Sequence, residues 1–225
     1  MSAGPSMMGK GRLEAFSDGV LAVAITLLVL DLHVSTTDKH SLWRQLTSDD
    51  WPAFTAYLVS FFVIGTIWVN HHALLMLIER VDRAMLFYNL LLLFWVSTIP
   101  FTTSALADYI KDGTTANVRV AVLLYGVSNE GMAIAFLLIV RHMLYKPLVE
   151  GPVPLDARRR GVIRFGLGSL LYPIVTVVGL FSVLAMYALY LATIVYYIAD
   201  QTQLLPVGEK SVDVVDLDED ATSPG

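Results

Sequence analysis

Residues 16–32 read FSDGVLAVAITLLVLDL, an apolar segment that holds one carboxylate near each end. The 12 residues between Asp18 and Asp31 are uncharged, and as an α-helix they span roughly 18 Å. The hydrocarbon layer of a membrane is roughly 30 Å thick, so at least one carboxylate lies near hydrocarbon depth or thins the bilayer locally. Such groups usually face water or the interior of a helix bundle. We therefore predict a membrane helix that does not face lipid.

The composition extends this prediction to the whole chain. Of the 225 residues, 56% are hydrophobic and 16% are charged, whereas a soluble domain carries about 25% charged residues. The mean hydropathy is +0.63. The absence of Cys excludes disulfides and thiol chemistry. A signal peptide is the competing interpretation of the N-terminus, but Glu14 and Asp18 interrupt its start, so we expect a retained first helix.

Apolar segments long enough to cross a bilayer recur along the chain and predict an all-α membrane protein with six spans. The uncharged run 165–199 would be about 52 Å long as one helix, so we expect a hairpin with its turn near 179–182. The predicted domain covers 13–200, between an N-terminus at 1–12 and an acidic, disordered tail at 201–225. The other four predicted spans are 13–32, 54–78, 85–106 and 118–140.

The positions of Lys and Arg predict the orientation of these spans. With six spans, 11 of the 15 basic residues lie on the same side as both termini, including Arg158, Arg159 and Arg160 in the predicted 141–164 loop. An excess of Lys and Arg marks the cytoplasmic side. We therefore expect a multi-pass protein of the cell membrane with both termini in the cytoplasm. The arginine cluster is most simply a topology anchor, and binding of anionic lipid is the second interpretation.

The first helix carries two different stripes. Small residues at 15, 19, 22 and 26 follow one side, and such residues allow close helix packing in membranes. A neighbouring bulky stripe contains Val20, Val23, Leu27 and Leu30. On spacing alone this stripe is a packing face. The alternative is a hydrophobic constriction that lines a pore.

The motif around the first helix resembles that of a known family. Residues 12–19 fit Arg-x-x-x-Phe-Ser-Asp-Gly, and Trp68, His71 and His72 follow in the second span. Asn89 and Pro100-Phe101 in the third span also fit. The chain from 10 to 200 is similar to the prokaryotic branch of the endosomal and lysosomal potassium channel family called transmembrane protein 175.

This resemblance implies a homotetramer in which four copies of the first helix surround a central pore. It places the apolar constriction at Val23, Leu27 and Leu30, and a polar layer at Thr26. It also implies that polar residues tie the first helix to the second and third. Trp68 and a histidine are suitable donors for Ser17 and Asp18. The implied clasp and gating set contains Arg12, Phe16, Ser17, Asp18, Trp68, His71 and His72.

Two further polar features lie inside predicted spans. His71 and His72 diverge by about 100° on a helix, so a shared metal ion is not expected. Glu130 lies midway along the fourth span, where a carboxylate is either functional or a protonated hydrogen-bond donor. Both interpretations of Glu130 remain open.

The leading functional hypothesis is a passive cation channel that favours potassium and has no carbonyl selectivity filter. The alternative is a proton-coupled transporter that uses Glu130, His71 or His72. Ser17, Asp18 and His71 have the composition of a hydrolase triad, but nothing fixes their geometry, so we expect no enzyme. We expect the lipid bilayer, further copies of the chain and monovalent cations as partners, and no cofactor, metal or nucleic acid.

Overall fold

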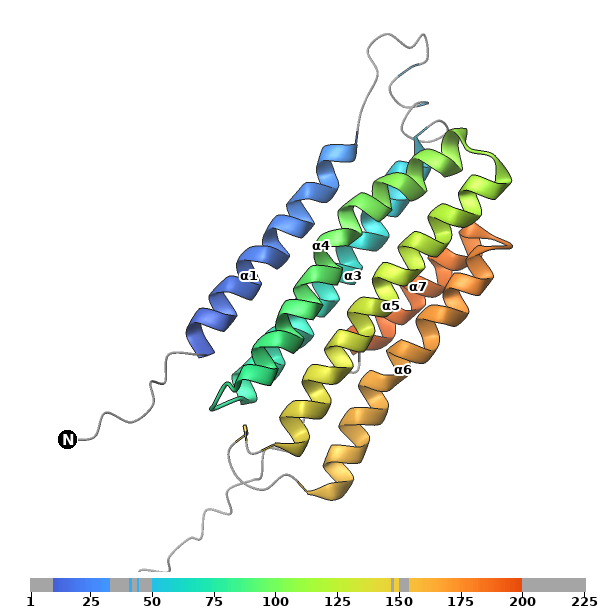
Figure 1. Cartoon of the computed structure of the whole chain (residues 1–225). Coiled ribbons are helices and arrows are strands. Elements are labelled where there is room, and N and C mark those ends of the chain that lie inside the picture. The colour runs from blue at the N-terminus through green and yellow to red at the C-terminus, as the bar shows by residue number, and fades with distance from the viewer. Residues whose placement is uncertain are drawn as a thin grey trace, which may run out of the picture.

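The computed structural model describes residues 10–32, 41, 44, 50–146, 148–149 and 154–199. The elements of the described part of the chain are helices, and the β-pairing found there is an isolated bridge between Ile78 and Val149. This confirms the predicted all-α class. The predicted tail at 201–225 lies outside the described residues. The elements are α1 (Lys10–Leu27), the 3₁₀ segment η1 (Leu28–Asp31), α3 (Trp51–Leu77), α4 (Arg83–Asp112), α5 (Thr115–Tyr145), α6 (Leu155–Gly179) and α7 (Val183–Ala199) (Figure 1).

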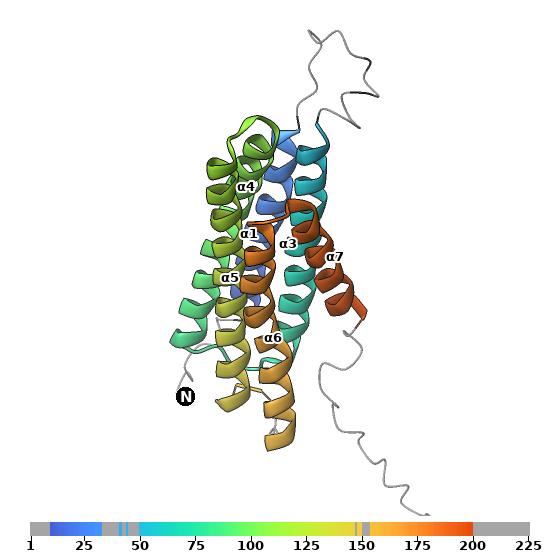
Figure 2. The ribbon, with the colours of Figure 1, turned by 90° about the vertical axis from the view of Figure 1, so that its right-hand side faces the viewer.

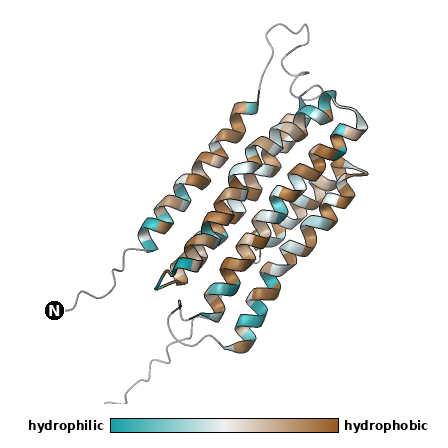
Figure 3. Cartoon of the chain, viewed as in Figure 1, coloured by the Kyte–Doolittle hydropathy of each residue, from teal (hydrophilic) through white to brown (hydrophobic). Residues whose placement is uncertain are grey.

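The helices have the length and composition of membrane spans. Five of them, counting α1 together with η1, are long and apolar enough to cross a bilayer, and α7 is a shorter apolar helix. Hydrophilic residues gather towards the helix ends (Figure 3). The predicted hairpin is confirmed, because α6 ends at Gly179 and α7 begins at Val183. All six predicted spans are therefore present as helices.

Several helices extend beyond the predicted spans. The first helix begins at Lys10, and α4 and α5 continue to Asp112 and Tyr145, whereas the predicted spans began at 13 and ended at 106 and 140. More significantly, α6 begins at Leu155 and not at 165, which places Arg158–Arg160 on a helix and not in a loop. Charged residues hid this start, because hydropathy marks the hydrocarbon layer and a helix can continue beyond it. Arg160 lies 2.7 Å from Asp156, an i,i+4 ion pair that fits a helical start.

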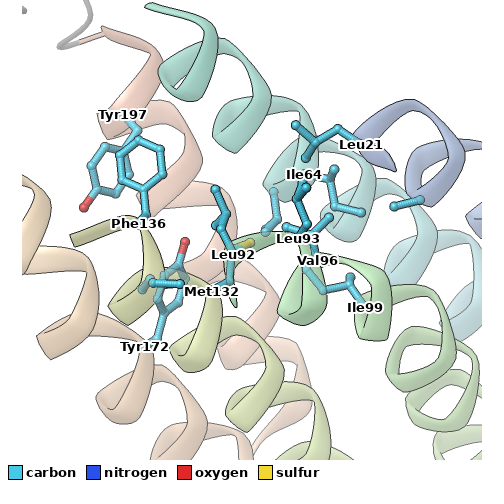
Figure 4. Packing of buried hydrophobic residues seen from close by; sticks show 14 of the residues in the cluster. Leu21, Ile64, Leu92, Leu93, Val96, Ile99, Met132, Phe136, Tyr172 and Tyr197 are labelled. Carbon is cyan, nitrogen blue, oxygen red and sulfur yellow. The ribbon is translucent and has the colours of Figure 1, made fainter. Parts of the chain in front are cut away.

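The helices form a bundle in which consecutive helices run antiparallel, whereas the contacting pairs α1–α4 and α3–α7 run parallel. Helix α4 packs on α5, α5 on α6, α6 on α7, and α7 returns to α3, which contacts α4. Helix α1 lies at one edge of this group, against α3 and α4 (Figures 1 and 2). Figure 4 shows the interior, where Leu92 and Val96 of α4 lie among Ile64, Met132 and Phe136. Among the described elements, helix α1 thus has neighbours on one side only.

Small residues permit close approach of α5 to α6. A β-carbon at Gly126 would lie 2.2 Å from Thr176 Oγ1, so only glycine fits there without movement. Hydroxyl groups add polar links, since Ser60 Oγ lies 2.8 Å from Thr103 Oγ1 and 3.0 Å from Tyr125 Oη. Small residues and side-chain hydrogen bonds are the usual means of holding membrane helices together.

Asp82 begins α4 and links it to α5. Its carboxylate accepts a hydrogen bond from the Met85 amide at 2.8 Å and lies 2.8 Å from His142 Nε2. Desolvation raises the pKa of Asp82, but the Met85 amide, His142 and Lys146 outweigh it, so the pKa lies below its ordinary value. This N-cap therefore favours the charged carboxylate.

Candidate functional site

Helix α1 has one buried face and one exposed face. Its buried residues are Leu13, Ser17, Leu21 and Ala24, and Leu28 continues this face into η1. The bulky residues of the other face are open, with exposed fractions of 57% for Val23 and 64% for Leu30. An apolar face of this length, left open by its own chain, indicates that lipid or another protein surface covers it.

The exposed face contains all four residues for which a pore role was inferred. Val23 and Leu27 lie on the last turns of α1, and Leu30 lies on η1. Thr26 is also exposed, and its hydroxyl donates to the Val23 carbonyl at 2.9 Å. The geometry thus places three bulky apolar side chains and one satisfied hydroxyl on the same surface.

The small-residue stripe lies on this exposed face and does not pack inside the chain. Ala15, Gly19, Ala22 and Thr26 are all exposed. A β-carbon at Gly19 would meet no atom within 4 Å. The expectation of close packing is therefore not met by any other helix of the described chain, because α3 and α4 contact the face of Leu21, Ala24 and Leu28.

A network centred on Asn89 holds the buried face of α1. Asn89 Nδ2 donates to Ser17 Oγ at 2.9 Å, and Ser17 in turn donates to the Leu13 carbonyl at 2.8 Å. Asn89 Oδ1 lies 2.8 Å from His71 Nε2. Because a carbonyl oxygen can only accept, His71 Nε2 carries the proton. This Asn89 network joins α1, α3 and α4 through three fully buried side chains.

Asp18 and Glu14 lie beside α3, one helical turn apart. Trp68 Nε1 donates to Asp18 Oδ1 at 2.9 Å. His72 Nδ1 lies 3.3 Å from Glu14 Oε1. His71 and His72 thus face different neighbours, as helical periodicity predicts.

The remaining residues of the implied clasp lie apart from these contacts. Arg12 is exposed, and no hydrogen bond or ion pair of its guanidinium is seen within the described chain. Phe16 is 55% exposed and lies on the open face of α1, where it lines a shallow groove with Gly19, Val23 and Ser97. The structure therefore connects Asp18 of α1 to Trp68, and Ser17 of α1 to His71 through Asn89, but within the described chain it does not connect Arg12 to them.

Sequence reasoning left Asn89 out of the site, although Asn89 forms its centre. The available signal was a single amide within the apolar run of α4. Such a residue needs a partner in hydrocarbon, but periodicity alone does not show which helix supplies it. The histidine predicted to meet Ser17 reaches it only through Asn89.

Glu130 lies at the middle of α5, remote from α1 in the chain and in its contacts. Its Oε2 atom is shielded from solvent and has no hydrogen-bond partner among the described residues. Among the described residues, no hydrogen bond or ion pair connects Glu130 to the Asn89 network. The structure therefore separates Glu130 from the features around α1.

Together, these features define a multi-pass α-helical membrane protein with a polar-anchored first helix and an open apolar face. Comparison with known proteins identifies the family. The family model described as the endosomal/lysosomal potassium channel TMEM175 matches residues 12–100. A potassium channel of Streptomyces collinus is 45% identical over 174 residues, which cover 75% of this chain and 81% of that protein. The chain belongs to the TMEM175 family, and the resemblance inferred from its motifs is confirmed.

Solved structures agree with this assignment. The crystal structure of a lysosomal potassium-selective channel TMEM175 homologue from Chamaesiphon minutus matches with a TM-score of 0.73 and 32% identity. The match covers 86% of this chain and 98% of that one. The endosomal/lysosomal proton channel TMEM175 of Homo sapiens is 37% identical over 117 residues, but these are 47% of this chain and 23% of the human protein. The chain thus matches a family of channels and not of enzymes.

Proposed function

We propose that this protein is a passive cation channel of the cell membrane that favours potassium. The observation that carries the proposal is the open apolar face of α1, in a chain whose bacterial relatives are named potassium channels. Ions would move down their own gradient. Both termini would lie in the cytoplasm. In the described chain, most Lys and Arg residues lie on the side of the bundle where α1 begins, and an excess of these residues marks the cytoplasmic side.

The pore requires several copies of the chain, because α1 has its open face on the outside of one copy. In a homotetramer, four such faces would meet around a central axis. Val23, Leu27 and Leu30 would form rings that narrow the pore and exclude water. Thr26 would supply a hydroxyl layer between these rings, and the Asn89 network would hold each α1 against its own bundle.

Selectivity in this proposal does not depend on a filter of backbone carbonyls. The backbone is helical through the proposed constriction, first as α1 and then as the 3₁₀ segment η1, so its carbonyl groups point along the helix. Side chains alone would line the narrow part. Discrimination between cations would then arise from the width of the apolar rings and the hydroxyl of Thr26.

Flux into sealed vesicles tests the proposal. Purified protein in proteoliposomes should conduct potassium down an imposed potassium gradient with no other gradient present. Sodium in place of potassium should give slower flux. Empty liposomes are the control for lipid leak. A potassium ionophore added at the end gives the maximum flux and so shows that the vesicles are sealed and carry the gradient.

A proton-coupled transporter is the competing function. The names of the relatives do not favour it, and Glu130 is separated from the α1 contacts. Potassium flux that stops when the proton gradient is abolished would support the transporter and overturn the channel. Flux that persists with equal pH on both sides supports the channel.

A further inference from the structure

Three side chains with metal-binding atoms meet where α1 crosses α3. They are Glu14 and Asp18, one turn apart on α1, and His72 on α3. One ligand atom from each lies within 4.8 Å of the other two. Ligands of one metal ion at bond lengths of about 2.0–2.2 Å lie roughly 3–4.4 Å apart, so small side-chain rotations bring the three into coordination distance.

The charges at this point are not balanced by a basic residue. Within the described chain, no Lys or Arg forms an ion pair with Glu14 or Asp18; Lys10, one turn before Glu14, instead donates to the Met76 carbonyl at 3.2 Å. Trp68 donates to one oxygen of Asp18, which leaves the second oxygen for another partner. Two carboxylates therefore face the same small volume, and no Lys or Arg side chain of the described chain pairs with either of them.

The imidazole of His72 faces Glu14 directly. Its Nδ1 atom is shielded from solvent and makes no hydrogen bond within the part of the chain described, although it lies 3.3 Å from Glu14 Oε1. A shielded ring nitrogen needs a proton acceptor or a metal ion. Either a proton on Nδ1 or a metal ion between the two atoms makes this contact with the carboxylate attractive. The Trp68 ring lies beside the imidazole, with the two ring centroids 6.0 Å apart.

We propose that Glu14, Asp18 and His72 form a binding site for a divalent transition metal ion of the zinc class. One imidazole with two carboxylates suits such an ion better than Mg²⁺, which prefers oxygen ligands alone. Water completes the coordination, because all three residues are partly exposed. The site lies near the start of α1 and the end of α3, where an ion can enter from the aqueous phase on that side.

The bound ion would join α1 to α3 without touching the apolar face of α1. Glu14 and Asp18 lie on the edge of α1 that contacts α3, whereas Val23, Leu27 and Leu30 lie on the open face. Metal binding therefore does not depend on the channel proposal. An experiment that finds no metal binding and an experiment that finds no potassium flux are therefore separate results.

Calorimetric titration of the full chain tests the site. Protein in detergent, stripped with a chelator, should bind Zn²⁺ at one saturable site per chain. Glu14→Gln and His72→Gln remove one ligand each and should weaken binding at least about tenfold. His142→Gln is the matched control, because it removes an imidazole that faces only one carboxylate, and it should bind Zn²⁺ like the wild type.

Several outcomes would overturn the proposal. These are the absence of saturable Zn²⁺ binding to the wild type, unchanged binding to both Glu14→Gln and His72→Gln, and equal weakening in His142→Gln. Circular dichroism and gel filtration identify variants that fail to fold. Asp18 is left unchanged in this test because its hydrogen bond with Trp68 also holds α1, so the other two ligands decide the result.

Discussion

Asn89 of α4 places a fully buried amide between α1 and α3. Its two ends serve Ser17 and His71, and all three side chains are fully buried. A buried polar group that loses its partner costs about 1–3 kcal/mol. Asn89 is therefore a point at which one substitution affects two helices that are distant in sequence.

Replacement of Asn89 by Ala should lower the unfolding midpoint of the detergent-solubilised protein. Both Ser17 and His71 would lose a partner, and a small cavity would remain. Thermal unfolding followed by circular dichroism measures the effect. Ser97→Ala on the same helix is the control, because Ser97 is exposed and donates only to the Phe94 carbonyl of its own helix. Equal midpoints for Asn89→Ala and wild type would contradict the structural role of the network.

Leu27 and Leu30 should influence ion flux through their size. In the proposed tetramer, Leu27→Ala or Leu30→Ala widens an apolar ring, so the leak should rise severalfold or the preference for potassium over sodium should fall. Vesicle flux with each ion in turn measures both quantities. Leu170→Ala is a matched control, since Leu170 is 66% exposed on α6 and Leu30 is 64% exposed. Unchanged flux in both variants would argue against a pore on this face.

The close contact of α5 with α6 depends on Gly126, because glycine has no side chain. Alanine at this position normally favours a helix by up to about 1 kcal/mol, but here its β-carbon would overlap Thr176. Gly126→Ala should therefore destabilise the bundle, as measured by the unfolding midpoint. Gly65→Ala is the control, because a β-carbon at Gly65 would meet nothing within 4 Å. An unfolding midpoint that rises equally in both variants would contradict a requirement for glycine at the contact between α5 and α6.

The start of α4 should show a pH dependence that originates at Asp82. Since the pKa of Asp82 is lower in the folded protein, its charge stabilises the fold above about pH 3.9, the ordinary value. This stabilisation is lost as the pH falls through the lower folded value. Asp82→Asn keeps a capping side chain but loses the charge. Its unfolding midpoint should therefore be lower than that of the wild type near pH 6, and the difference should shrink towards pH 3. The exposed Asp108→Asn is the control, and a difference independent of pH would contradict the charge-based origin.

At the scale of the whole molecule, assembly should bring the open faces of α1 together. The natural chain has no Cys, so a single Cys at Gly19 reports contacts between copies without background. Oxidation in native membranes should give disulfide-linked dimers of Gly19→Cys, which denaturing electrophoresis detects. Leu170→Cys on α6 should remain monomeric on the same gel. Cross-linking at Leu170 but not at Gly19 would place the interface elsewhere.

The sequence predicted the number of spans, the hairpin at 179–182 and the family because hydropathy and the Phe-Ser-Asp motif are local signals. It missed the start of α6, because Arg158–Arg160 lie on helix that extends beyond the apolar segment. It also missed the centre of the α1 contacts. A single Asn89 in an apolar helix shows that a partner is needed, but the partner depends on how α1, α3 and α4 pack, and that is a property of the three-dimensional arrangement.

The change from α-helix to 3₁₀ helix after Leu27 has a consequence for the orientation of Leu30. In a 3₁₀ turn, residues i and i+3 are eclipsed, so Leu30 lies almost directly above Leu27. If the same residues wound as an α-helix, three steps of about 100° would turn Leu30 by roughly 60° about the axis and shorten the segment. A change of this single turn between 3₁₀ and α geometry would therefore rotate the side chain of Leu30 about the helix axis. The position of α1 before Leu27 would stay the same.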